Sequence, residues 1–269
     1  MNILITGASG GLGLACAKAL AAAGDTVYAL DLHPVAEAEG LRFFSADITQ
    51  EDALLAVREA LGDTKLDAIV HFAGMIFIDN FLEVSEQRLT RIFDVNVLGA
   101  MRVNRVFFPL LAENGRILIT TSEVAPLDPL PFNGIYSTTK TALDCYAQAL
   151  RQEVGLLGRR VITLRPGAFQ TPLSAGSIPS MHAMAEKSAY FGGQGERFEA
   201  LMRRFTGKLL QPEVLAKRVC RILHAAHPRN IYTVHANLGL RLLAILPKSS
   251  QTRLVRALLG RNRRSHKQS

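Results

Sequence analysis

The chain contains only three cysteines, Cys16, Cys145 and Cys220, and they lie far apart. An odd, scattered set supports neither a disulfide framework nor a zinc knuckle, so we expect reduced, mostly buried thiols of a cytoplasmic protein. His224 and His227 are three residues apart near an expected helix end. This pair alone is a weak signal, and we expect no metal site.

Long apolar runs, low-complexity tracts and internal repeats are also absent. No stretch reaches ~18 uninterrupted apolar residues, so we expect no membrane-spanning helix. The N-terminus begins with a strand-like segment and lacks the basic-then-apolar layout of a signal peptide, which again favours a cytoplasmic location. A chain of 269 residues suits one α/β domain that buries about three quarters of its unfolded surface.

Acidic residues are absent from residues 238–269, whereas eight basic residues lie there. Residues 1–237 carry 23 basic and 23 acidic side chains, so this tail alone produces the net charge of +8. Pro247 separates its two apolar segments, and in the second the apolar side chains share one side of a helical wheel. That side comprises Leu254, Val255, Leu258 and Leu259, opposite Arg253, Arg256, Arg263 and Arg264.

Such a basic amphipathic helix is typical of a segment that lies on an anionic membrane surface, so peripheral membrane contact is one expectation for the tail. A helix that packs on the enzyme or on a partner subunit and a solvated basic end are the alternatives. Nucleic-acid binding is not expected, because neither a recognition fold nor interleaved aromatic residues accompany the charge. We therefore divide the chain into one domain, residues 1–237, and a tail, residues 238–269.

Short β-branched runs alternate with longer helical segments along residues 1–237. Parallel neighbours need a crossover helix, so this alternation predicts a Rossmann-type α/β fold, a doubly wound parallel sheet of about seven strands with helices on both faces. Residues 173–210 interrupt the alternation and are interpreted as a mobile lid. The expected strands are Asn2–Thr6, Thr26–Asp31, Leu41–Ser45, Ala68–Phe72, Arg116–Thr121, Arg160–Arg165 and Asn230–Val234. The expected helices are Leu12–Ala23, Gln50–Leu61, Ser85–Leu111, Ile135–Leu157 and Pro212–Ala226.

A glycine-rich turn, Thr6–Gly13, follows the first expected strand and opens the first expected helix. A strand that turns sharply into a helix presents free backbone N–H groups and the positive end of the helix dipole. A pyrophosphate can approach these groups where side chains are missing, which predicts a dinucleotide site. The cofactor-binding positions assigned to the turn are Gly7, Ser9, Gly10, Gly11, Leu12 and Gly13.

The second expected strand ends at Asp31. A carboxylate there can accept hydrogen bonds from both hydroxyls of the adenosine ribose and would repel a 2′-phosphate. Neither Gly10 in the turn nor Leu32 after Asp31 supplies a cation for such a phosphate. The sequence therefore favours NAD over NADP, and a helix cap or a solvated loop acid is the alternative interpretation of Asp31.

Tyr136 and Lys140 lie four residues apart in an expected helix and so share one of its faces. Tyrosine is a poor base at neutral pH because its ordinary pKa is ~10, and a nearby ammonium together with a positively charged nicotinamide would lower that pKa. Lysine can also reach a ribose hydroxyl. Upstream, hydroxyls at the end of the fifth expected strand could polarise a substrate carbonyl; Ser122 is preferred there, and Thr121 is the alternative.

Six motifs in this order resemble the short-chain dehydrogenase/reductase family, and the resemblance covers most of residues 1–235. Thr6–Gly13 looks like the family's cofactor turn. The resemblance implies further cofactor contacts. Asp47 and Ile48 would lie beside the adenine, and the small residues Ala73 and Gly74 would leave room for the cofactor. Pro166, Gly167 and Thr171 would border the nicotinamide, and Tyr136 and Lys140 also count among the cofactor-binding residues.

The resemblance also implies catalytic roles. Asp94–Gly99 is similar to the helix motif whose asparagine, here Asn96, links Lys140 to water in a proton relay. Tyr136 would deliver or remove the hydroxyl proton, Ser122 would steady the oxygen, and Lys140 would lower the pKa of the phenol. The implied reaction is hydride transfer between nicotinamide and a carbonyl carbon, in a protein that forms homodimers or homotetramers.

Two features depart from the family pattern. The usual Asn-Asn-Ala-Gly reads His71-Phe72-Ala73-Gly74 here, so the side-chain hydrogen bonds expected after the fourth strand must be replaced. The segment between Ser122 and Tyr136 is longer than usual and contains three prolines, which indicates a loop reshaped around the substrate. The glycine spacing also fits the longer, sugar-nucleotide-modifying branch, but the Asn96 motif and the modest length favour the compact single-domain branch.

Apolar residues dominate the expected lid and the segments near the active site. They predict an apolar secondary alcohol or ketone of steroid, retinoid or fatty type, with ordinary core packing as the alternative. Pro131–Gly134 also resembles the steroid- and retinol-oxidising members. The leading hypothesis is an NAD(H)-dependent oxidoreductase; the alternatives are a catalytically silent NAD-binding sensor or scaffold and a membrane-surface interaction protein. The residues near the site are Met75, Phe77, Leu130, Phe132 and Phe169.

Overall fold

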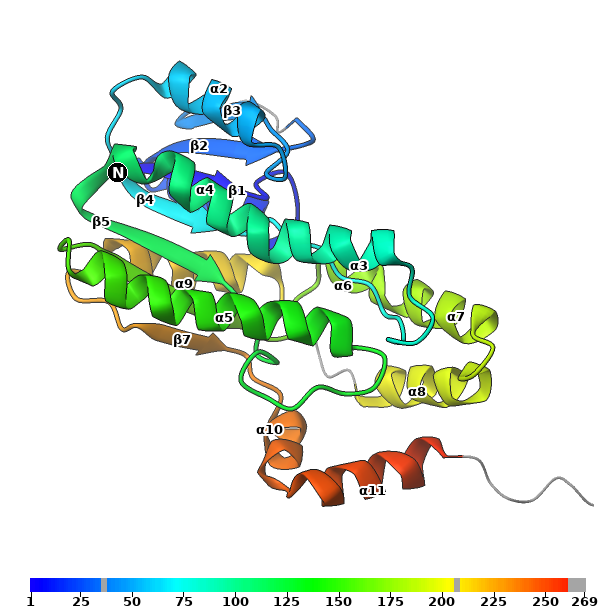
Figure 1. Ribbon diagram of the computed structural model, residues 1–269. Coiled ribbons are helices and arrows are strands. Elements are labelled where there is room, and N and C mark those ends of the chain that lie inside the picture. The colour runs from blue at the N-terminus through cyan, green and yellow to red at the C-terminus, as the bar shows by residue number, and fades with distance from the viewer. Residues whose placement is uncertain (35–37, 206–208, 261–269) are drawn as a thin grey trace, which may run out of the picture.

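A computed structural model describes residues 1–34, 38–205 and 209–260. Its centre is one sheet of seven parallel strands in the order β3-β2-β1-β4-β5-β6-β7 (Figure 1). The order reverses between β1 and β4, and in doubly wound sheets this reversal opens a crevice at the carboxyl ends of the strands. The predicted Rossmann-type fold is confirmed. The strands are β1 (Asn2–Thr6), β2 (Thr26–Asp31), β3 (Leu41–Ser45), β4 (Leu66–His71), β5 (Leu111–Thr120), β6 (Arg160–Pro166) and β7 (Ile231–Val234).

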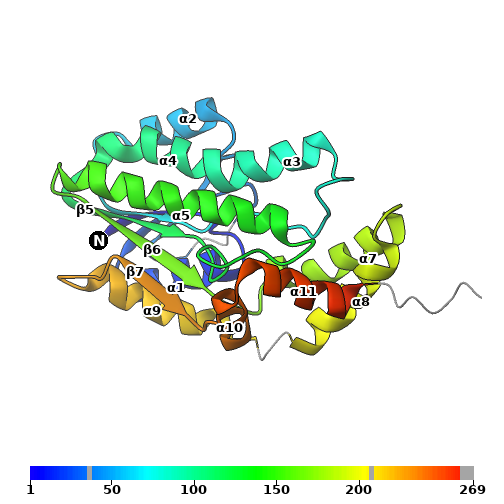
Figure 2. The same cartoon turned by 60° about the horizontal axis from the view of Figure 1, so that its bottom comes forward.

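Helices cover both faces of the sheet (Figures 1 and 2). One face packs against α2 (Glu51–Leu61), α4 (Ala100–Phe107) and α5 (Gly134–Gly155), with Phe107 fully buried among them. The other face packs against α1 (Gly11–Ala22) and α9 (Pro212–His224). Because both faces are covered, the central strands are near-continuous apolar runs rather than alternating ones.

The helix expected over Ser85–Leu111 forms as one continuous helical segment from Glu86 to Leu110, but it is not a uniform α-helix. The structure has α3 (Glu86–Phe93), a π-helical turn η1 (Asp94–Gly99), α4 and a short 3₁₀ turn η2 (Phe108–Leu110), and Leu111 already begins β5. Pro109 lacks the N–H that a continuing helix needs, which ends α4. Gly99 lets η1 approach the α2 side closely, because an added Cβ would lie 2.6 Å from Ile48 Cδ1.

The expected lid is helical, with α6 (Pro172–Ala175), α7 (Ser177–Lys187) and α8 (Gly192–Phe205). The tail forms α10 (Leu238–Ile245) and α11 (Lys248–Leu259), and α11 packs against α8 (Figure 2). A small apolar cluster joins the lid, the tail and the loops before them. Its buried members are Ile78, Phe132, Met181, Met184, Phe198 and Leu259.

The apolar side predicted for α11 is divided between two environments. Val255 and Leu259 pack on the lid cluster, whereas Leu254 and Leu258 stay exposed. Packing on the enzyme therefore accounts for half of that side, and Arg263 and Arg264 lie outside the described residues. Among the described residues, no helix is both long and apolar enough to cross a bilayer.

The cysteines differ in burial from what was expected. Cys16 is buried, and burial raises the pKa of its thiol, but Cys145 is exposed and Cys220 is half-buried. All three are free thiols. His224 pairs with the buried carboxylate of Asp25 at 3.1 Å, and within the described ranges no three His, Cys, Asp or Glu side chains are grouped to hold a metal.

Candidate active site

The glycine turn joins β1 to α1 at the point where the strand order reverses. Gly7 has a φ of +70°, and a Cβ there would lie 2.4 Å from Ala73 N; a Cβ on Gly13 would lie 2.0 Å from Gly7 O. Gly10 caps α1 without a side-chain hydrogen bond, and an added Cβ there would meet nothing within 4 Å. The helix α1 therefore begins without a side-chain cap and with free room beside Gly10, and this arrangement fits the pyrophosphate of a dinucleotide.

Asp31 ends β2 beside this turn. Its carboxylate accepts hydrogen bonds from Ser9 N (2.9 Å) and Leu32 N (2.7 Å). The structure therefore brings Asp31 and the turn together, as the sequence predicts.

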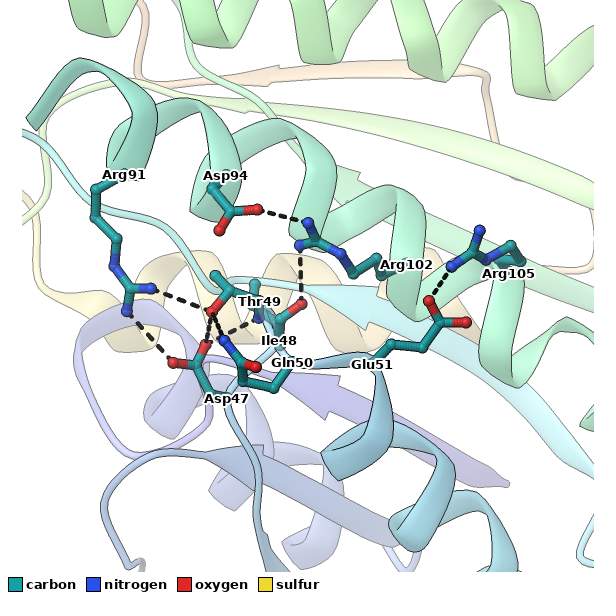
Figure 3. Close-up of polar contacts among 9 residues, drawn as sticks. All are labelled: Asp47, Ile48, Thr49, Gln50, Glu51, Arg91, Asp94, Arg102 and Arg105. Carbon is teal, nitrogen blue, oxygen red and sulfur yellow. Dashed lines mark hydrogen bonds and ion pairs between the residues drawn. The ribbon is translucent and has the colours of Figure 1, made fainter. Parts of the chain in front are cut away.

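Asp47 and Ile48 belong to a polar network that fastens the segment before α2 to the α3–α4 side (Figure 3). Asp47 accepts from Thr49 N (2.8 Å) and pairs with Arg91 at 3.4 Å, while Arg102 bridges Ile48 O (3.5 Å) and Asp94 (2.7 Å). Burial acts to raise the pKa of Asp47, but the hydrogen bonds from Thr49 and the charge of Arg91 outweigh it, so this pKa is lowered. The expected adenine contact is held in place by the chain's own ion pairs.

Tyr136 lies in the first turn of α5, and Lys140 lies one turn later. Lys140 is buried; its Nζ lies 5.8 Å from the centre of the Tyr136 ring and donates to Thr120 O at 3.2 Å. Ser122, at the end of β5, hydrogen-bonds the Tyr136 hydroxyl and accepts from Val124 N at 3.3 Å. The three side chains predicted as catalytic therefore converge at the carboxyl end of β5.

The pKa of Tyr136 departs from the expected direction. Burial raises it to about 12, the hydrogen bond with Ser122 acts against this rise, and the charge of Glu123 adds to it. Burial also lowers the pKa of Lys140 to about 8. The protein's own groups thus keep Tyr136 a neutral phenol at neutral pH, whereas the predicted lowering of its pKa also depends on the charge of a nicotinamide.

Asn96 is buried in the π-helical turn η1. Its Oδ1 accepts from Met75 N (2.8 Å), and its Nδ2 donates to Met75 O (2.9 Å) and Thr139 Oγ1 (3.0 Å). A Cβ on Gly74 would lie 3.2 Å from Asn96 Oδ1 and 3.6 Å from Lys140 Nζ, so these three residues meet at one point. The π turn is the local feature that sets Asn96 against α5, and π turns often occur at functional sites.

The Thr121 hydroxyl is engaged away from Tyr136. It donates to Asp144 Oδ1 at 3.1 Å, and the same carboxylate takes two hydrogen bonds from the Arg165 guanidinium at 2.9 and 2.6 Å. This geometry favours Ser122 over Thr121 as the residue beside the tyrosine. Asp144 was missed in the sequence, although it lies eight residues after Tyr136, on the same face of α5.

His71, which replaces the family's asparagine, is buried at the end of β4. Its Nε2 lies 2.8 Å from Asn104 Oδ1, and Asn104 Nδ2 donates to the Tyr146 hydroxyl at 3.0 Å. Since Asn104 uses its NH₂ toward Tyr146, a neutral His71 donates from Nε2. Burial lowers the pKa of His71 to about 4, and the hydrogen bond with Asn104 acts weakly against this. A long-range polar chain thus replaces the missing local hydrogen bonds.

The end of β6 at Pro166 and the segment after it, with Gly167 and Thr171, lie at the carboxyl end of the sheet, as the glycine turn does. A Cβ on Gly167 would lie 1.9 Å from His235 O and 3.1 Å from Glu123 Oε1, so only glycine fits. The Thr171 side chain caps α6 by accepting from Ser174 N at 3.1 Å, and its Cγ2 would lie 3.2 Å from a Cβ on Gly11. The predicted nicotinamide segment therefore borders the glycine turn.

The residues expected to line the substrate site separate into three groups. Met75 and Phe77 pack with Tyr136, and Leu130 and Phe132 pack with the lid. Phe169 is instead buried on the opposite face of the sheet with α9, so its assignment to the lining is wrong. Glu123 was missed as a neighbour of the site, and it accepts a hydrogen bond from Asn237 N at the start of α10.

Known proteins resemble this chain in sequence and in fold. A family model described as short chain dehydrogenase matches residues 1–181. The estradiol 17-beta-dehydrogenase 2 of Rattus norvegicus is 33% identical over 199 residues, which cover 69% of this chain and 52% of that protein. The chain thus spans about half the length of this relative.

Two further proteins resemble nearly the whole chain. The NADPH-dependent 1-acyldihydroxyacetone phosphate reductase of Saccharomyces cerevisiae is 28% identical over 246 residues, covering 85% of this chain and 80% of the yeast protein. A solved short chain dehydrogenase family protein from Francisella tularensis superposes with a TM-score of 0.73 at 21% identity, over 87% of this chain and 96% of that one. The second likeness supports the fold alone.

Proposed function

This chain belongs to the short-chain dehydrogenase/reductase family, and we propose that it transfers hydride between NAD(H) and an apolar secondary alcohol or ketone, with Tyr136 as general acid and base. The oxidoreductase class, acting on CH–OH groups, follows from the family. The cofactor preference, the substrate class and the roles of single residues are the proposal.

One observation carries it: Ser122 hydrogen-bonds Tyr136, Lys140 lies beside the Tyr136 ring, and Lys140 and Asn96 meet at Gly74, next to Ala73, which touches the glycine turn. When bound, the nicotinamide supplies or accepts the hydride. The Tyr136 hydroxyl gives its proton to the carbonyl oxygen in reduction and takes it back in oxidation, while Ser122 donates a hydrogen bond to that oxygen. A pKa of about 12 keeps the Tyr136 proton available at neutral pH, which suits reduction.

Asp31 supports NAD as the cofactor, because its carboxylate would repel a 2′-phosphate. The yeast relative is named NADPH-dependent, so relatives do not decide the preference. Asp31→Asn keeps an acceptor for Ser9 N and removes the charge. We expect the ratio of NADP to NAD affinity to rise roughly tenfold or more, measured by NADH and NADPH fluorescence titration. Asp47→Asn is the charge-matched control and should leave that ratio unchanged.

The lining supports an apolar substrate of steroid, retinoid or fatty type. Met75 and Phe77 pack with Tyr136, and Phe132 joins the loop before α5 to the lid. The rat relative is named for a steroid alcohol, which is compatible with such a lining. The yeast relative is named for an acyldihydroxyacetone phosphate, which combines an acyl chain with a charged phosphate.

A panel of hydroxysteroids, retinol and long-chain secondary alcohols tests the proposal through NADH formation. Tyr136→Phe should lower kcat by about a thousandfold or more while NAD still binds, because only the proton donor is lost. Tyr146→Phe, on the same helix, should keep kcat within severalfold. If NAD binds and no alcohol or ketone of the panel reacts, the silent sensor or scaffold replaces the enzyme.

We also propose that the tail contacts an anionic membrane surface through α10. Leu238, Leu242 and Ile245 share one side of this helix and are 68%, 57% and 78% exposed, with Arg241 beside them. Flotation with phosphatidylserine vesicles should fail for Ile245→Glu and persist for Leu156→Glu.

The homodimer or homotetramer stays a proposal, which light scattering tests.

A further inference from the structure

An apolar groove lies where four segments distant in the sequence meet on the lid side of the molecule. The loop after β4, the loop before α5, the residues that open α8 and the end of α11 form its walls, and its volume is about 370 Å³. Phe132 forms part of the lining and packs edge-on against Phe191 and Phe198, with ring centres 5.6 and 5.4 Å away. The groove is therefore built on the buried cluster that fastens the lid.

Two large apolar side chains of this groove are exposed. Phe81 is 59% and Leu82 is 73% exposed, on the loop after β4. The Phe81 ring also abuts α5, because a Cβ on Gly134 would lie 2.5 Å from Phe81 Cε2. Gly134 begins the helix that carries Tyr136 two residues later. The groove thus combines apolar surface in contact with water and a position next to the active-site helix.

Arg256 supplies the charge of the groove. Of the described residues in the lining, this arginine alone is charged, and no carboxylate in the described part of the chain pairs with its guanidinium. The sequence from residue 238 to 269 contains no acidic residue. A second copy of the chain would bring a like-charged tail to this surface, so an anionic ligand fits better than self-association.

We propose that this groove binds a free, single-chain anionic amphiphile such as a long-chain carboxylate. The alkyl chain lies along Phe81, Leu82, Phe132 and Leu259, and the head group pairs with Arg256. The groove shares Phe132 with the proposed substrate lining but not Met75 or Phe77. This inference goes beyond the proposed function, because binding requires no hydride transfer and is measured without cofactor.

The chain has no tryptophan, so Phe81→Trp introduces a sole fluorescent reporter at the groove. Dodecanoate, kept below its micelle concentration, should shift the emission of this reporter to shorter wavelength and saturate at one equivalent. Hexanoate should bind roughly a hundredfold or more weaker, because six methylenes are lost. Dodecyltrimethylammonium, with the same chain and the opposite charge, should bind more weakly than dodecanoate. Binding at many sites, or equal binding of the two charges, overturns the proposal.

Calorimetry with dodecanoate on the wild type and on matched variants provides the second measurement. Arg256→Gln should weaken binding about fivefold or more, whereas Arg253→Gln, one turn earlier on the same helix and outside the groove lining, should not. Leu82→Gln should also weaken it, and the exposed Leu156→Gln should not. Equal effects of the two arginine substitutions would indicate that dodecanoate is attracted to the positive charge of the tail in general, and would overturn the proposal of a binding groove. Binding to phosphatidylserine vesicles without any binding of free dodecanoate would assign this surface to a membrane instead.

Discussion

The proposed cofactor side and the proposed substrate side of the candidate active site are held together in different ways. On the cofactor side, β1, β2 and β4 are buried on both faces of a continuous sheet, and the glycine turn grows directly out of β1. On the substrate side, α7, α8 and α11 rest on one small apolar cluster and on a few long-range polar bonds. The family model stops at residue 181, inside α7.

We infer from this difference that the sheet side of the site controls the proposed hydride and proton transfer, whereas the side formed by α7, α8 and α11 controls which substrate is accepted. The position of the reacting groups follows from strand register and from contacts of backbone with backbone, which leave little freedom. The lid and tail are positioned by side chains such as Ser180, which exchanges hydrogen bonds with the Ile78 backbone at 2.9 and 3.2 Å. We therefore expect substitutions on the first side to affect folding and cofactor binding together. Substitutions on the second side should affect the substrate and the local stability of α7, α8 and α11, but not cofactor binding.

The largest effect is expected from Gly13→Ala. Its Cβ would lie 2.0 Å from Gly7 O, a backbone atom that cannot turn aside, so α1 must move away from β1. We expect a loss of about 3 kcal/mol or more in the free energy of unfolding, measured by urea denaturation, together with loss of NAD binding. Gly10→Ala has open space at the same helix end and should fold normally. A Gly13→Ala protein as stable as the wild type would contradict the backbone-controlled cofactor side.

Phe132→Ala probes the other side of the comparison. This side chain joins Phe191, Phe198 and the tail, so its loss should loosen α7, α8 and α11 without loosening the sheet. We expect amide exchange in those helices to quicken about a hundredfold, which corresponds to roughly 3 kcal/mol of local stability. Exchange in β1 and β4 should stay unchanged. Phe107→Ala, under the sheet, should instead destabilise the whole protein.

His71 tests whether the cofactor side depends on a buried neutral imidazole. Its pKa is about 4 in the folded chain, below the ordinary 6.5, so the folded state binds fewer protons than the unfolded state between these values. Stability from this residue is complete above pH 6.5 and is lost as the pH falls toward 4, by up to roughly 3 kcal/mol. His71→Asn should flatten the fall in unfolding free energy over this range, while His33→Asn, which is exposed, should not.

The smallest effect on stability is expected where the proline-rich loop between Ser122 and Tyr136 contacts the tail. Asp128 pairs with Lys248 and accepts from Gln251 Nε2 at 2.7 Å. Lys248 is largely exposed, so Asp128→Asn should cost less than about 1 kcal/mol. The change should be visible only as faster amide exchange in α11. A global loss of stability would show that the tail is part of the main core.

Features that depend on neighbouring residues in the sequence were predictable. Features that depend on contacts between distant segments were not. The bounds of β1, β2 and β3 agree with the predictions to the residue, because each is an apolar run between turn residues. The π turn at Asp94–Gly99 and the helices of the expected lid were missed, since both depend on packing against other segments. The His71–Asn104–Tyr146 chain joins residues up to 75 positions apart. No sequence window contains it.

The site shows the same division. The convergence of Ser122, Tyr136 and Lys140 follows from one strand end and one helix, and it was predicted from the order of the motifs together with the family resemblance. The upward shift of the Tyr136 pKa was not predicted, because the burial that causes it depends on all the residues packed around the ring. Residue types therefore indicated the chemistry, and the fold decided its electrostatics.

The separation of chemistry from selectivity is tested most directly by the kinetics of a short and a long ketone, 2-butanone and 2-dodecanone, with NADH. In Phe132→Ala, kcat for 2-butanone should stay within about twofold of the wild type, while the preference in kcat/KM for 2-dodecanone should fall tenfold or more, because the lid loses an apolar contact of about 1.4 kcal/mol or more. An equal fall for both ketones would contradict the account, since the lid side would then share in the chemistry.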